Sequence, residues 1–147
     1  MKRFTFKLAA LLELRKEHEE RIKLRLAGKN REIIAATGEL NVYYGDLKEL
    51  QASEKTRRAG NEPVLLLRYS VAYRYKLKND ILRTGRRIDD LRAEATGIQR
   101  NLLEATKARR ALELIRDRQF AAWKKEQRRR EQKFIDDVAQ QQYIASH

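Results

Sequence analysis

The segment that decides the fold is residues 22–50, which read IKLRLAGKNREIIAATGELNVYYGDLKEL. Its apolar residues recur at alternating steps of three and four, a spacing that is typical of a coiled-coil seam. Two sets of positions share the seam: a holds Leu26, Ile33, Leu40 and Leu47, and d holds Ile22, Ala36, Tyr43 and Leu50. Lys29 is the one misfit on these positions. The segment is therefore predicted to be a long helix with a single packing stripe.

A second segment, residues 77–112, keeps the same rhythm with Thr84 as its polar exception. Its apolar seam residues are Ile81, Ile88, Ala95 and Leu102 at a, and Leu77, Leu91, Ile98, Ala105 and Leu112 at d. Between the two segments stands one strong turn signal, Ala-Gly-Asn-Glu-Pro at residues 59–63. Gly60 suits the end of a helix, and Pro63 suits the first turn of the next. Two long helices joined by so few residues are expected to run antiparallel.

An antiparallel pair brings each a residue against a d residue of the partner helix. One register does this in every layer, and the midpoint of each pair falls at residue 62, inside the turn. The facing pairs are Leu47 with Leu77, Tyr43 with Ile81, Ala36 with Ile88, Ile33 with Leu91, Leu26 with Ile98, Ile22 with Leu102, and Leu12 with Leu112. A single register centred on the breaker supports a hairpin more strongly than either seam alone.

We therefore expect an all-α fold, in which two long helices form an antiparallel coiled-coil hairpin and the second helix overhangs at the C-terminus. Residues 1–147 are expected to form one domain, with helix 1 at about 6–58, a turn at 59–63 and helix 2 at about 64–140. The overhang should start near Arg116, and residues 140–147 should fray. Arg15 and Glu19 interrupt the seam, which predicts looser packing there. Phe4 and Phe6 are expected to be exposed in the N-terminal lead.

The composition favours long helices and an anionic partner. Of 147 residues, 37% are charged and 7% aromatic, with one proline and no cysteine, which excludes disulfide and thiol chemistry. The formal charge of +13 favours nucleic acid, lipid headgroups or an acidic protein as partner. No stretch approaches the ~20 apolar residues of a membrane span, and residues 8–12 are too short for a signal-peptide core. We expect a cytoplasmic protein without a transmembrane segment.

No constellation of catalytic residues is found. The two histidines are His18 and His147, and His18 lacks the second histidine of a zinc-protease helix. No phosphate-binding loop is present, and no serine has a histidine nearby. We therefore expect no enzyme activity, no cofactor, and no catalytic, cofactor-binding or metal-binding residue.

Two surfaces remain as candidates for binding. Tyr69, Tyr73 and Tyr75 gather after the turn beside Leu77, where they either cover the thin end of the seam or form a docking patch. The second surface is the overhang, whose bases crowd beside Trp123: Lys124, Lys125, Arg128, Arg129, Arg130 and Lys133. Such a run is ordinarily a solvated helix face. An unpaired helix of this length is marginal alone, however, and with Trp123 and Phe134 it favours a binding segment.

Stretches at both ends of the chain carry a family resemblance. Residues 4–15, FTFKLAALLELR, are similar to the start of the flagellar export protein FliJ family of type III secretion, the central-stalk component of its ATPase complex. Residues 116–123, RDRQFAAW, with 129–133, RREQK, are similar to its C-terminal pattern. Asp136-Asp137 departs conservatively from the Asp-Glu expected there. Length, hairpin and overhang extend the resemblance to the whole chain.

The resemblance implies a stalk that places the open end of the hairpin in the pore of a hexameric flagellar export ATPase. It further implies that the stalk promotes assembly and activity of the ring, links it to the cytoplasmic domain of the export gate, and escorts export chaperones. Localisation would be cytoplasmic, with peripheral association with the inner-membrane export apparatus. Matched by position, the gate-docking residues are Tyr73 and Leu77, with Tyr69 beside them. The ATPase-binding residues are Phe4, Phe6, Leu8, Arg129, Gln132 and Lys133, with Trp123.

Three alternative functions are also consistent with the sequence. A nucleic-acid-binding coiled coil is supported by the basic excess, but interleaved acids and the lack of a recognised motif oppose it, so no nucleic-acid partner is expected. The stalk protein of a virulence injectisome would share most of these features. A purely structural rod would make the overhang dispensable.

Overall fold

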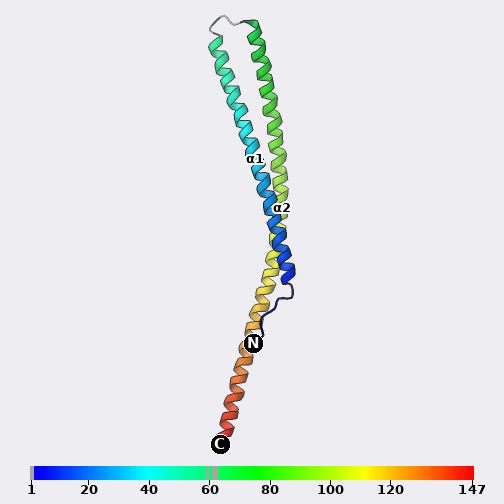
Figure 1. Ribbon diagram of the computed structural model, residues 1–147, viewed down its shortest axis with the longest axis vertical. Helices are drawn as coiled ribbons and strands as arrows, with labels where there is room; N and C mark the ends of the chain where they lie inside the picture. The colour runs from blue at the N-terminus through cyan, green and yellow to red at the C-terminus, as the bar shows by residue number, and fades with distance from the viewer. Residues whose placement is uncertain (1, 59, 61–62) are drawn as a thin grey trace. The chain divides into compact units, whose positions relative to one another are not determined.

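The heptad pattern produces two helices. In the computed structural model, which describes residues 2–58, 60 and 63–147, helix α1 spans Ala9–Arg57 and helix α2 spans Val64–Ala145 (Figure 1). The described residues contain no strand, so the predicted all-α class is confirmed. Of the predicted turn, Ala59, Asn61 and Glu62 lie outside the described residues.

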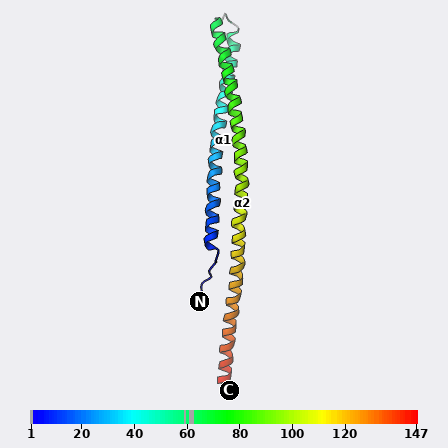
Figure 2. The same cartoon turned by 90° about the vertical axis from the view of Figure 1, so that its right-hand side faces the viewer.

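Contacts divide the chain into two units. One unit is Arg21–Leu102, and the other combines the N-terminal residues up to Glu20 with Leu103–His147. Within the first unit, α1 and α2 lie side by side and run in opposite directions on either side of the turn (Figures 1 and 2). This arrangement confirms the antiparallel hairpin, whereas the number of domains stays a prediction.

The buried side chains follow the predicted register. In the hairpin unit, Ala36 and Ile88 are buried together with Leu91, and Ile33 packs against them. Ala36 faces Ile88 and Ile33 faces Leu91, as the alignment about residue 62 requires. In the other unit, Leu12 is buried with Leu112, which is a third predicted pair.

The one misfit of the first seam is accommodated by an ion pair. The register places Lys29 opposite the small, buried Ala95, which leaves room for a long side chain. The Lys29 ammonium lies 2.6 Å from the Glu94 carboxylate and 3.6 Å from that of Glu32. The hydrogen bond to Glu94, followed by the charge of Glu32, raises the pKa of Lys29 and so favours its charged form.

The prediction of looser packing at Glu19 is wrong. Glu19 is only 4% exposed, because the seam position opposite it is Ala105 and polar groups flank that alanine. Glu19 accepts a hydrogen bond of 3.3 Å from the Thr106 hydroxyl and another from the Arg109 guanidinium. Arg109 also donates to Glu113 at 2.8 Å, and its hydrogen bonds to Glu19 and then Glu113 raise its pKa. A buried acid with these partners forms a closed polar layer instead of a gap.

Both outer helix ends differ from the expectation. Helix α1 starts at Ala9, not near residue 6, because the Phe6 side chain turns into the core and its carbonyl accepts the first bond from the Ala9 amide at 3.2 Å. Helix α2 continues to Ala145 instead of fraying after residue 140. There the Ser146 hydroxyl donates to the Tyr143 carbonyl at 3.0 Å, and the Tyr143 ring stacks on His147.

Substitutions at two neighbouring alanines of α1 test the register of the helix pair. Replacing Ala36, which is 2% exposed and faces Ile88, with leucine should lower the free energy of unfolding by about 1–3 kcal/mol, because the filled layer has no room for the added carbons. The same change at exposed Ala35 should alter it by less than about 0.5 kcal/mol. Urea unfolding followed by circular dichroism measures both, and equal effects would contradict the register.

Candidate functional site

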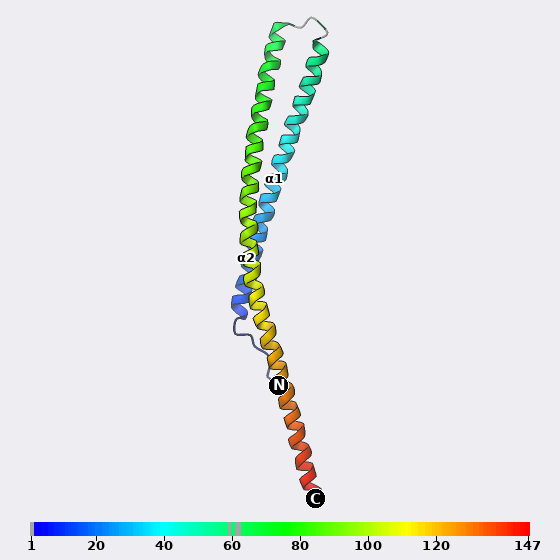
Figure 3. The same cartoon turned by 180° about the vertical axis from the view of Figure 1, so that it is seen from behind.

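An aromatic clamp joins the N-terminal lead to α2. We use this name for Phe4, Phe120 and Trp123: the Phe4 ring meets Phe120 edge-on at 5.2 Å and Trp123 at 5.9 Å between centroids. The Phe120 and Trp123 rings stack at 5.9 Å, and the Lys124 ammonium lies 5.3 Å from the Phe120 centroid. Figure 3 shows the lead running beside this part of α2. Pairing therefore continues to Trp123, which corrects the prediction that the overhang starts near Arg116.

Phe6 lies in the core. It is 8% exposed and packs with Leu12 and Leu112, while Phe4 is half-buried against that cluster. The expectation that both rings are exposed is therefore wrong, because an extended lead can fold its aromatic side chains back onto the seam. Leu8 remains exposed. Among the N-terminal residues proposed for ATPase binding, Leu8 is exposed and Phe4 is partly accessible.

The tail, residues 124–147, is helical to Ala145 and has no buried side chain; Glu126, Gln127 and Val138 are half-buried. Arg129, Gln132 and Lys133 are all exposed, and their spacing of three and four places them on one face. Gln132 donates to Asp136 at 2.9 Å, one turn further along that face. Arg129 has an exposed ion pair with Glu126 at 3.8 Å, which stabilises little.

The opposite face of the tail is partly apolar. At 3.6 residues per turn, Phe134 and Val138 continue the side of α2 that carries Phe120 and Trp123. Phe134 and the adjacent Ile135 are strongly exposed. The tail thus offers a basic face and an apolar face to its surroundings at the same time.

At the loop end of α2, the predicted gate-docking residues separate into two kinds. Tyr69 and Tyr73 are exposed, with spacing that places both on one flank of the seam; we call them the tyrosine flank. Leu77 is 3% exposed because it occupies the seam itself. Leu77 can influence a partner by holding this flank in place, whereas its own surface is covered.

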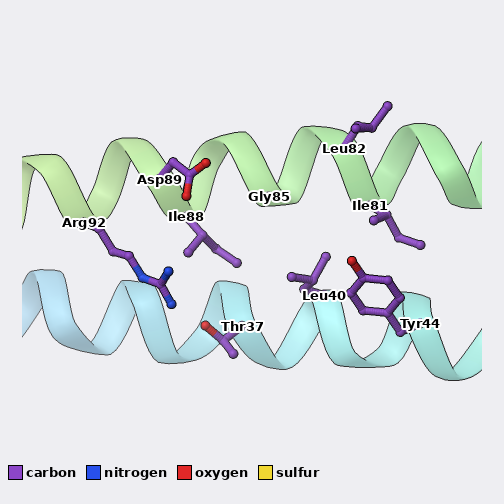
Figure 4. Close-up of a pocket in the computed structure, with 9 residues that line it drawn as sticks. All are labelled: Thr37, Leu40, Tyr44, Ile81, Leu82, Gly85, Ile88, Asp89 and Arg92. Atoms are coloured by element: carbon purple, nitrogen blue, oxygen red, sulfur yellow. The ribbon is translucent and has the colours of Figure 1, made fainter.

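The described residues form several hollows that were not anticipated from the sequence, including the following two. One is a groove of about 370 Å³ between the helices of the hairpin unit, where Leu40 and Tyr44 of α1 meet Ile81 and Ile88 of α2, and Gly85 leaves the wall without a side chain (Figure 4). Arg92 reaches across it toward α1. The other, of about 470 Å³, lies on α2 alone and is lined by Val64, Leu67, Arg68, Val71, Ala72 and Tyr75. The helical spacing of these six residues was the available signal for it.

The described residues contain neither a cluster of candidate metal ligands nor a membrane-spanning helix. No group of three or more His, Cys, Asp or Glu side chains among them is placed to hold a metal ion. None of the helical stretches that the structure describes is both long and apolar enough to cross a bilayer.

A comparison with protein families distinguishes between the alternative functions considered from the sequence. Residues 4–147 match the family described as Flagellar FliJ protein. The chain belongs to this family. Comparisons with curated proteins and with solved structures gave no match.

Membership makes the chain a component of flagellar type III protein export. It associates with the flagellar export apparatus, and the FliJ family is one of export components and not of catalysts. The family also selects the flagellar over the injectisome reading, and a protein-export role over a nucleic-acid one. The resemblance drawn from residues 4–15 and 116–137 is thereby confirmed.

The clamp can be tested with the chain's one tryptophan, Trp123. Phe4→Ala should red-shift Trp123 fluorescence and increase its quenching by acrylamide, because the ring that covers the indole is removed. Phe134→Ala is the control, since this exposed ring lies three turns further along α2 and should leave the spectrum unchanged. An unchanged spectrum for Phe4→Ala would show that the lead does not cover Trp123 in solution.

Proposed function

We propose that this chain is the central stalk of the flagellar export ATPase, and that its tail enters the pore of the ATPase hexamer. The observation that carries the proposal is the exposed continuation of α2. After Trp123 no other described segment of the unit runs beside the helix in Figure 3, yet the helix continues to Ala145. A long solitary helix in water gains nothing from packing, so its exposed apolar residues suggest a partner.

The distribution of basic and apolar residues around the tail helix supports binding inside a pore. Arg129 and Lys133 lie on one face, and Phe134 lies on the opposite one. A partner docked on one side would cover one of these faces and leave the other in water. A ring that surrounds the helix would cover both, with acidic groups opposite the bases and apolar groups opposite Phe134.

The distribution of charge also supports ATPase binding by the terminal segments of the chain. Residues 1–30 hold nine bases and four acids, and residues 116–147 hold eight bases and five acids. More than half of the net +13 is therefore carried by the two terminal segments, which would be drawn into a pore with acidic walls. A stalk without sixfold symmetry contacts six subunits unequally, and this inequality is a means of promoting ring assembly and biasing nucleotide states.

The loop end supplies the second contact. The tyrosine flank presents two exposed rings beside a buried seam, and tyrosine is enriched at binding hot spots. We assign this flank to the cytoplasmic domain of the export gate, and the outer faces of the helices to the escort of export chaperones. The protein then acts in the cytoplasm, held peripherally at the inner membrane through the gate.

Charge reversal in the tail tests the ATPase contact. Arg129→Glu with Lys133→Glu should lower affinity for the export ATPase on the order of 100-fold and abolish its stimulation of ATP hydrolysis, because two charge-assisted contacts become repulsions. The matched control is Lys107→Glu with Arg110→Glu, two exposed bases of the paired region. Equal stimulation by both double variants would remove the tail from the ATPase site.

The gate contact is tested by comparing Tyr73→Ala with Leu77→Ala. The first should weaken binding to the isolated gate domain while changing the free energy of unfolding by less than about 1 kcal/mol, because Tyr73 is exposed. The second should lower that free energy by about 2–5 kcal/mol, because it opens a cavity in the seam. Calorimetric titration and urea unfolding measure the two quantities. Full gate affinity in Tyr73→Ala would contradict the assignment.

A further inference from the structure

At the loop end of α2, the seam positions that face α1 are polar, and positions that face away from α1 are apolar. Its seam positions are Ser70, which is buried, and Arg74, which is half-buried and paired with Glu54. Outward positions of the same turns are apolar: Val71 is 63% exposed and Tyr75 is 70% exposed. Packing of a hairpin favours the reverse arrangement. The outward apolar side chains are therefore not explained by the pairing of α1 with α2.

These side chains form a continuous stripe. Val64, Leu67, Val71 and Tyr75 follow one another at steps of three and four and line the groove of about 470 Å³ on α2; we call them the loop-end stripe. The tyrosine flank is separate from it. Two residues correspond to 200° of helix, so Tyr73 lies roughly 160° around the axis from Val71. The stripe is thus a second surface at this end, distinct from the one assigned to the gate.

Strong positive charge surrounds the stripe. From residue 64 to residue 79 the chain contains no acid, and besides Arg74, which is paired with Glu54, it contains Arg68, Lys76 and Lys78. Residues 55–83 hold eight bases and two acids, nearly half of the net charge of the chain. A second copy of the chain would bring the same positive charge against this surface. The occupant should instead be anionic and able to cover aliphatic side chains.

We propose that the loop-end stripe lies on the surface of an anionic lipid bilayer, with Arg68 and Lys78 at the headgroup phosphates. Aliphatic and tyrosine side chains on one face, with flanking bases, are the pattern of helices that lie in the membrane interface. Arg68 lines the groove itself, and Lys78 falls on the same face seven residues after Val71. Their long side chains reach the phosphates while the stripe contacts the acyl boundary.

A bilayer fits this surface better than a single acidic helix does. The first turn of α2 is apolar on every side, since Val64, Leu65, Leu66 and Leu67 follow one another and all are exposed. One partner helix would cover the stripe and leave Leu65 in water. A membrane interface is continuous and covers neighbouring directions together. This contact would add to the gate and ATPase contacts and does not depend on either.

The test is sedimentation of the full chain with vesicles at near-physiological salt. Vesicles of phosphatidylglycerol and phosphatidylethanolamine should bind it at least about tenfold more tightly than phosphatidylcholine vesicles. Leu67→Gln with Val71→Gln should lower partitioning at least about tenfold, because two apolar side chains no longer enter the interface. Arg68→Gln with Lys78→Gln should lower it about thirtyfold, at about one kcal/mol for each base.

Three controls make the result decisive. Ile34→Gln with Val42→Gln changes two exposed apolar residues of α1 and should leave partitioning within about twofold. Tyr73→Ser should do the same, which separates the bilayer contact from the gate contact. Circular dichroism shows that each variant keeps its helices.

Any of three results overturns the proposal. Equal binding to neutral and anionic vesicles would exclude recognition of the headgroup charge. Wild-type partitioning of Leu67→Gln with Val71→Gln would reduce the effect to non-specific electrostatics. Stripe-dependent binding of a synthetic acidic amphipathic helix, without stripe-dependent binding of vesicles, would identify a protein partner instead.

Discussion

The antiparallel register is the constraint on which the other features depend. Each seam residue meets one facing residue, so a long polar side chain is accommodated most readily opposite a short one. Ala95 provides this space for Lys29, and Ala105 provides it for Glu19. A slip of one heptad would place Glu19 against Ile98 or Leu112 and Lys29 against Ile88 or Leu102. Polar seam residues thus stabilise the helix pair little and specify its alignment strongly.

Periodicity made the fold predictable, and the limits of periodicity explain what was missed. The spacing from Ile22 to Leu50 and from Leu77 to Leu112, extended back to Leu12, is sufficient to derive the buried pairs. Phe4 and Phe6 precede the helix, where no repeat indicates the direction of a side chain. Their contacts to Phe120 and Leu112 are tertiary, so the sequence pattern contains no signal for them.

The candidate site was predictable as regions and less so as individual residues. The heptad already placed Leu77 on the seam, so its burial follows from the same argument that predicts the hairpin. Tyr69 and Tyr73 fall off the seam and are exposed. The loop-end stripe was obscured because apolar residues surround the first turn of α2, and a continuous apolar run hides the position of its face until the partner helix is placed.

Buried and exposed residues alternate along α2, and the length of α1 determines how far along α2 the buried ones extend. Helix α1 begins at Ala9, so helix-on-helix pairing ends near Leu112, and the lead then extends contact to Trp123 through Phe4. Among the described residues, the contacts of the lead on α2 thus extend as far as Trp123. Substitutions of buried residues before it act first on folding, whereas after it no described side chain is buried. A loss of function at Phe6 or Leu77 would therefore reflect positioning, whereas one at Arg129, Lys133 or Tyr73 would reflect the contact itself.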